Sequence, residues 1–88
     1  MSKLNVTLNV ADIPVRIKVE PQVEGYIRNG VADLNDIVAS YKKNGPEKEH
    51  GYYLALAAIQ CAARARQLQR ELELLKESDK KLAEALNQ

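Results

Sequence analysis

The C-terminal part of the chain carries a long seam of apolar and small residues. From Leu54 to Leu86 these residues recur at alternating steps of four and three, which is the heptad spacing of a coiled coil. The members of the seam are Leu54, Ala58, Cys61, Ala65, Leu68, Leu72, Leu75, Asp79, Leu82 and Leu86. Strong helix formers fill the positions between them, so we predict a helix from about Glu47 to the C-terminus. The seam itself, from Leu54 to Leu86, spans roughly 50 Å of straight helix. Since nothing else in a chain of 88 residues could cover this seam, we expect a second chain to do so.

The two ends of the seam differ in the size of their side chains. Small residues at Ala58, Cys61 and Ala65 allow two helices to approach more closely than leucine would, and Cys61 is read as a small buried hydrophobic residue. The predicted dimer interface is Leu54, Ala58, Cys61 and Ala65, and the predicted coiled coil is Leu68, Leu72, Leu75, Asp79, Leu82 and Leu86. Asp79 has two open explanations: it fixes the register of the coiled coil, or it lies in a frayed and hydrated end.

A second apolar stripe widens the first half of this helix. It consists of Tyr52, Leu56, Ile59 and Ala63. Such a width suits a segment that packs against the rest of its own chain on one side and against another helix on the other.

Two segments near the N-terminus alternate apolar and polar residues, as half-buried strands do. The apolar positions are Leu4, Val6, Leu8 and Val10 in the first, and Ile13, Val15, Ile17 and Val19 in the second. Ala11 and Asp12 separate them, which predicts a hairpin. Because Pro14 cannot donate a hydrogen bond to a sheet, the second strand should be an edge there or begin after it. A two-stranded ribbon is marginal alone, so its apolar face needs a cover.

The segment that follows has the spacing of an amphipathic helix. Pro21 suits a first helical turn, and the acidic residues Glu20 and Glu24 favour its positive end. One helical face then collects Val23, Ile27, Val31, Leu34, Ile37, Val38 and Tyr41. Gly30 is predicted to mark a close approach of another element, and Asn44-Gly45-Pro46 to end the helix with a left-handed cap.

Composition excludes several classes of function. A single cysteine and a single histidine cannot form a disulfide framework or a Cys/His zinc site within one chain, and we expect neither cofactor nor metal. A net charge of +1 argues against a dedicated nucleic-acid binder. No apolar run has the length of a membrane span, so we predict a cytoplasmic protein without membrane insertion. No histidine, metal cluster or glycine-rich phosphate loop accompanies the carboxylates of the first helix, so we do not expect an enzyme.

The sequence therefore predicts an α+β fold: an N-terminal β-hairpin, one amphipathic helix, and a long helix that forms an intersubunit coiled coil. We divide the chain into a hairpin-plus-helix head, residues 1–50, and the long helix, residues 51–88. This order of elements, with Glu-Pro at 20–21, "VADLND" at 31–36 and the alanine-rich segment 54–62, resembles the ZapA family of bacterial cell-division proteins. Leu34-Asn35 is similar to the Leu-Asn pair common in the first helix of that family, which often has glycine where this hairpin has Ala11-Asp12.

The resemblance implies a non-enzymatic protein that binds the division GTPase FtsZ and crosslinks its filaments at the midcell septum. It also implies homodimers that join into antiparallel tetramers. Since FtsZ is acidic in general, the candidate contacts are the basic residues Arg16, Lys18, Arg28, Lys42 and Lys43 of the head. Each of them is also explained as an ordinary solvated charge.

Two other functions remain open at the level of sequence. One is a small DNA-binding dimer that reads bases with the outward residues Asn5, Thr7 and Asn9, which the balanced charge and the long coiled coil disfavour. The other is a generic coiled-coil adaptor with a different protein target.

Overall fold

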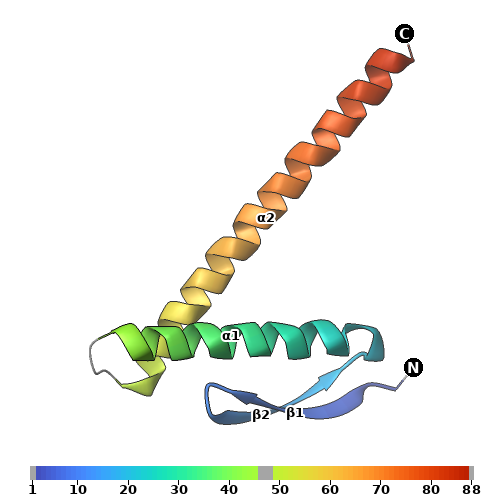
Figure 1. Ribbon diagram of the computed structural model, residues 1–88. Coiled ribbons are helices and arrows are strands. Elements are labelled where there is room, and N and C mark those ends of the chain that lie inside the picture. The colour runs from blue at the N-terminus through green and yellow to red at the C-terminus, as the bar shows by residue number, and fades with distance from the viewer. Residues whose placement is uncertain (1, 46–48, 88) are drawn as a thin grey trace. The chain divides into compact units, whose positions relative to one another are not determined.

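The computed structural model describes residues 2–45 and 49–87 and has the predicted order of elements (Figure 1). Strands β1 (Leu4–Val10) and β2 (Ile13–Val19) precede a single 3₁₀ turn, η1 (Pro21–Val23), and two helices, α1 (Glu24–Asn44) and α2 (His50–Leu86). The α+β fold with a terminal long helix is thereby confirmed. By its internal contacts the chain forms two compact units, residues 1–58 and 59–88, and α2 contributes to both. The functional boundary at residue 50 stays a prediction.

The hairpin has the predicted register. β1 and β2 are antiparallel, with Val10 opposite Ile13 and Leu4 opposite Val19, so the apolar positions of both strands share one face. Ala11 and Asp12 have φ values of 50° and 68°, and this left-handed pair makes the tight turn without the glycine that such a turn usually favours. Pro14 lies within β2, opposite Asn9. In a sheet of two strands β2 is an edge, as the proline requires.

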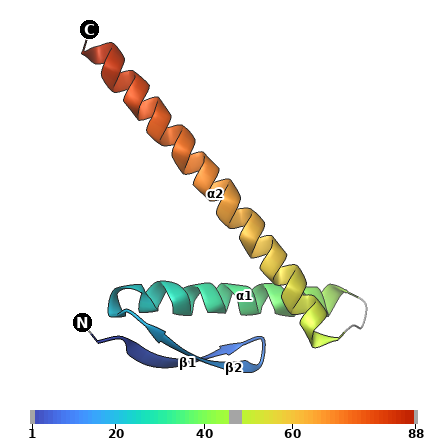
Figure 2. The same ribbon diagram turned by 180° about the vertical axis from the view of Figure 1, so that it is seen from behind.

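Helix α1 packs along the apolar face of the hairpin and divides the core into two clusters (Figures 1 and 2). Ile27 and Val31, from its first half, cover the cluster of Val6, Leu8 and Val19. Its second half contributes buried Val38 to the other cluster, with Leu34, Ile37 and Tyr41 packed around it. Ala11 from the hairpin turn and Tyr53 and Ala57 from the start of α2 complete that cluster. The marginal two-stranded ribbon thus gains the cover that its sequence demands.

The end of α1 differs from the prediction. Gly45 has φ −103° and ψ 171°, which is extended backbone, and no left-handed residue other than Ala11 and Asp12 occurs in the described part of the chain. The residue before a proline is restricted to extended conformations, and Pro46 in the sequence imposes this restriction on Gly45. A Cβ at Gly45 would lie 2.7 Å from the carbonyl oxygen of Tyr41. Glycine is therefore needed for a close approach and not for a left-handed cap.

The close approach predicted at Gly30 is also absent within the described chain. A Cβ built there would meet nothing within 4 Å, and Gly30 is exposed. The glycine leaves an open position on α1, because the core faces a different side of the helix.

Helix α2 begins at His50, three residues later than predicted, and Glu49 before it is not helical. The predicted start at Glu47 lies outside the described residues. The amide of Tyr52 donates to the carbonyl oxygen of Glu49 at 3.0 Å, which closes the first turn. Within residues 2–45 and 49–87, no helix has the length and the apolar character needed to cross a membrane.

Candidate functional site

The side chain of Asn35 ties α1 to the hairpin turn. Its Oδ1 accepts a hydrogen bond from the amide of Ala11 at 2.7 Å, and its Nδ2 donates to the carbonyl oxygen of Asn9 at 2.8 Å. One partner is the amide of Ala11, which is itself a left-handed turn residue, and the other is the carbonyl of Asn9, two residues earlier in β1. One amide side chain thus satisfies a donor and an acceptor and fixes the turn against the helix. Sequence reasoning identified Leu34-Asn35 as a motif but did not predict this contact, since the partners are more than twenty residues away.

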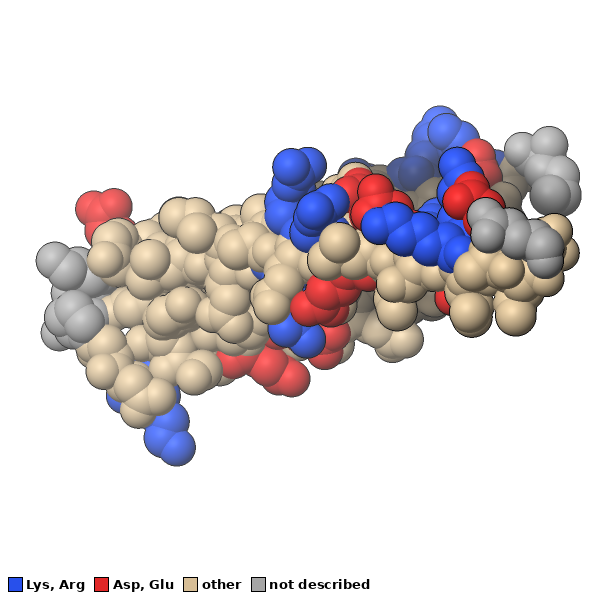
Figure 3. Space-filling view, turned by 90° about the horizontal axis from the view of Figure 1, so that it is seen from above, with Lys and Arg blue, Asp and Glu red and all other residues tan. Residues whose placement is uncertain are grey.

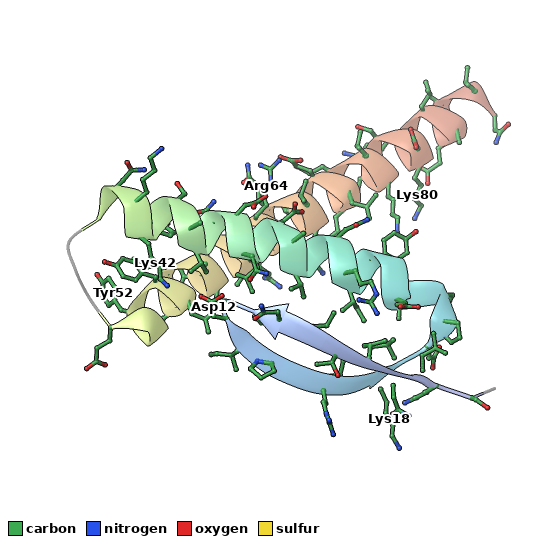
Figure 4. The ribbon with its side chains drawn as sticks, turned by 60° about the horizontal axis from the view of Figure 1, so that its bottom comes forward. Asp12, Lys18, Lys42, Tyr52, Arg64 and Lys80 are labelled. Carbon is green, nitrogen blue, oxygen red and sulfur yellow. The ribbon has the colours of Figure 1, made fainter. Side chains whose placement is uncertain are left out.

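Two of the candidate cations lie on the face of the hairpin that points away from α1, which we call the outer face. Arg16 lies opposite Thr7 and Lys18 opposite Asn5, and all four residues are exposed. Figure 4 shows Lys18 projecting from the hairpin on the side away from α1. These residues lie around an open hollow in the hairpin. The lining residues include no carboxylate: they are Asn5, Val6, Thr7, Arg16, Ile17 and Lys18. The outer face therefore presents positive charge without an acidic neighbour among its lining residues.

The other candidate cations lie on α1 and differ in their surroundings. The Nε of Arg28 lies 2.8 Å from a carboxylate oxygen of Glu24, one helical turn earlier, so its charge is already partly balanced. Lys42 and Lys43 are exposed in the last turn of α1, where cations favour the helix terminus. Lys42 also lines a shallow hollow with Asp12 and Asn35. Arg28 is thus the weakest candidate of the set for an acidic partner.

The predicted seam of α2 is largely open to solvent. Ala58 and Ala65 are exposed, whereas Leu54 and Cys61 are half-buried. The exposed fractions of its leucines are 48% for Leu68, 52% for Leu72, 63% for Leu75, 60% for Leu82 and 75% for Leu86. A regular row of exposed leucines on a long helix is typical of an interaction surface. Lys, Arg, Asp and Glu side chains are interspersed on the face of the molecule in Figure 3, so no large patch of one sign appears there.

The contact between α2 and α1 uses residues that the sequence analysis did not single out. Tyr53 is 4% exposed and Ala57 is completely buried, while Tyr52 and Ile59 of the predicted second stripe are 49% and 66% exposed. The lack of a side chain beyond Cβ at Ala57 permits close packing inside one chain. The spacing of four residues between Tyr53 and Ala57 was the available signal, but the richness of this segment in alanine concealed it.

The described residues contain no group of three or more histidine, cysteine, aspartate or glutamate side chains that could hold a metal ion.

Comparison with protein families gives a match to "Cell division protein ZapA" over residues 6–88. The chain belongs to the ZapA family. The match covers the hairpin, both helices and the seam, so it applies to the whole architecture and not to the coiled coil alone. The searches of curated proteins and of solved structures found no match.

Membership in the ZapA family establishes the general function. ZapA proteins are FtsZ-associated cell-division proteins that bundle FtsZ filaments, and they act as structural proteins without enzymatic activity. This function belongs to the division ring in the cytoplasm. The match also decides between the division role and the generic adaptor, which a coiled-coil seam alone could not separate.

Proposed function

We propose that this ZapA protein crosslinks FtsZ filaments as an antiparallel dimer of dimers. The observation that carries the proposal is the exposed seam of α2, since its leucines and alanines have no cover in a single chain. A second copy offers the same periodic surface, and two-fold self-association is the commonest assembly of soluble proteins. Leu54, Ala58, Cys61 and Ala65 form the close-packed interface, and Leu68 to Leu86 form the coiled coil.

We propose that the head, residues 1–50, contacts FtsZ through basic residues. The best placed are Arg16 and Lys18 on the outer face, followed by Lys42 and Lys43 at the end of α1. Arg28 is retained with less weight, because its guanidinium pairs with Glu24. Electrostatic complementarity between a basic head and an acidic filament raises the association rate and makes binding sensitive to salt.

Crosslinking follows from joining two such heads through a stiff spacer. A head that binds weakly gains effective affinity when its partner head is already held on a neighbouring filament. The coiled coil joins the two heads mechanically, and crosslinking requires no catalytic step. We propose that Asp79, within the seam, lowers the stability of the coiled coil and fixes its register; the alternative is that it lies in a hydrated end of the helix.

The test is co-sedimentation with FtsZ polymerised by GTP, at low and high salt, with electron microscopy of the pellet. Wild-type protein should pellet with bundled filaments, and less of it at high salt. Reversal of charge at Arg16 and Lys18 should weaken pelleting, whereas reversal at Lys80 and Lys81, which lie in the coiled-coil segment but not beside the seam contact, should leave filament binding unchanged. If both pairs of variants lose pelleting equally, the effect depends on the net charge of the protein, and the outer face is not the FtsZ-binding site.

A further inference from the structure

We propose that the free edge of β2 binds an extended segment of the partner in which acidic and apolar residues alternate. The segment would pair with β2 as a third strand, antiparallel or parallel to it. This inference deepens the proposed contact between the head and FtsZ and rests on it for the identity of the partner. The existence of the free edge follows from the hairpin alone and does not depend on the identity of the partner.

The register of the hairpin determines which backbone groups point outward. Beside a two-residue turn, Val10 and Ile13 form a hydrogen-bonded pair, and opposed pairs then alternate along the ladder. Asn9 therefore belongs to a pair whose backbone groups point away from the partner strand. The bond from Asn35 to the carbonyl oxygen of Asn9 agrees with this direction. By the same alternation, the amides and carbonyls of Arg16 and Lys18 point out from the free edge of β2.

The two edges of the sheet differ in their cover. Helix α1 covers the apolar face of both strands, but it packs more closely against β1 than against β2. In the part of the hairpin next to the turn, Leu8 of β1 is only 6% exposed, whereas Ile13 of β2 is 45% exposed. At the other end of the hairpin the order is reversed, since Leu4 of β1 is 39% exposed and Val19 of β2 is 5% exposed. Val15 and Ile17 of β2 are half-buried. A strand added to β2 would cover this remaining apolar surface with every second side chain.

The other side chains of the added strand would lie on the outer face, beside Arg16 and Lys18. Cross-strand neighbours of opposite charge stabilise a sheet, and like charges destabilise it. Acidic residues therefore fit at these positions. A second copy of β2 fits poorly, because antiparallel pairing around Ile17 would place Arg16 against Lys18. The simpler explanation, that Pro14 and the two cations only protect an edge from aggregation, predicts no bound segment at all.

The edge is tested directly with a short blocked peptide of alternating glutamate and valine, and with a rearranged peptide of the same composition. Each peptide is titrated into the ¹⁵N-labelled full-length protein, followed by amide hydrogen exchange. We expect the alternating peptide to bind at least about fivefold more tightly and to protect the amides of Arg16 and Lys18. Equal affinity for the two peptides, or unchanged exchange at both amides, would overturn the proposal in favour of simple edge protection.

A second experiment separates edge pairing from charge in the FtsZ pelleting assay. Arg16→Ala and Arg16→Pro both remove the positive charge, but only proline also removes the outward amide. Pro14 already occupies the equivalent position two residues earlier, and circular dichroism checks that the hairpin is retained. Arg16→Pro should weaken FtsZ binding about five- to tenfold more than Arg16→Ala.

Equal binding by the two Arg16 variants would overturn strand addition for FtsZ and leave a contact through charge alone. A wild-type protein that fails to pellet with FtsZ would instead contradict the proposed function, and the peptide titration would then decide the edge by itself.

Discussion

Among single residues, Asn35 has the largest structural role for its size, because it joins the hairpin turn to α1 by two hydrogen bonds. We predict that Asn35→Ala lowers the free energy of unfolding by about 1–2 kcal/mol, since both bonds are lost. Urea unfolding measures this change. The protein concentration must be held fixed, because self-association also contributes to stability.

Asn35→Asp is the matched control for this prediction. A carboxylate keeps an acceptor for the amide of Ala11 but offers no donor to the carbonyl oxygen of Asn9. Its stability should therefore lie between those of the wild type and Asn35→Ala. If Asn35→Ala unfolds at the wild-type urea concentration, the turn is held by the packing of Ala11 and not by this side chain.

Two glycines, Gly30 within α1 and Gly45 directly after it, provide a second prediction at the scale of residues. Gly30→Ala should raise the free energy of unfolding by about 0.5–1 kcal/mol, because alanine favours the helix and its methyl group meets open space. Gly45→Ala should lower it by about 1–3 kcal/mol, because its Cβ would press against the carbonyl of Tyr41. Thermal unfolding of the two variants in parallel checks the opposite signs. A loss of stability in Gly30→Ala would reveal a close contact with another chain at that position.

At the scale of elements, the periodicity of apolar residues was sufficient to predict a strand or a helix wherever the buried positions follow the period of that element. The alternation around Val6 and Ile17 predicted both strands, and the spacing of Ile27, Val31 and Val38 predicted α1. The periodicity did not predict which residues of different elements contact one another. In a segment so rich in alanine, the pattern did not distinguish Ala57, which packs within its own chain, from neighbouring Ala58, which stays exposed.

The candidate binding residues could be chosen from the sequence by charge, but they could not be ranked. The ion pair of Arg28 with Glu24 depends on side-chain conformation within one helix. The exposure of Arg16 and Lys18 beside an open strand edge depends on which strand α1 packs against more closely. The i, i+4 spacing of Glu24 and Arg28 was a sequence signal for the ion pair, whereas the open strand edge has no signature in the linear order of residues.

The seam of α2 yields a prediction about this element. Ala58→Glu or Ala65→Glu should weaken the dimer by about a hundredfold or more, because a charge without a partner would be buried where two helices meet closely. Ala63→Glu is the matched control, since Ala63 is exposed and lies away from the seam on the heptad. Sedimentation velocity over a range of concentrations distinguishes the variants. Dimers that survive glutamate at both seam positions but not at Ala63 would place the interface on the other stripe.

For the whole molecule, the proposed crosslinking requires two separable parts: a head that binds a filament and a helix that joins heads. Removal of the chain after Gln67 deletes the seam from Leu68 onward and keeps both core clusters, whose buried residues all precede Ala58. The truncated protein should remain folded, since none of its core is lost, but it should form at most a weak dimer.

The same truncation separates filament binding from bundling. A head without its spacer has no second head fixed at a distance, so the avidity of the assembly is lost. We expect the truncated protein to co-sediment weakly with FtsZ at low salt, and the pelleted filaments to appear single in electron micrographs. Bundles formed by the truncated protein would contradict a spacer role for residues 68–88. They would instead require that two filament-binding surfaces lie within the first 67 residues, for example the outer face of the hairpin and the lysines at the end of α1.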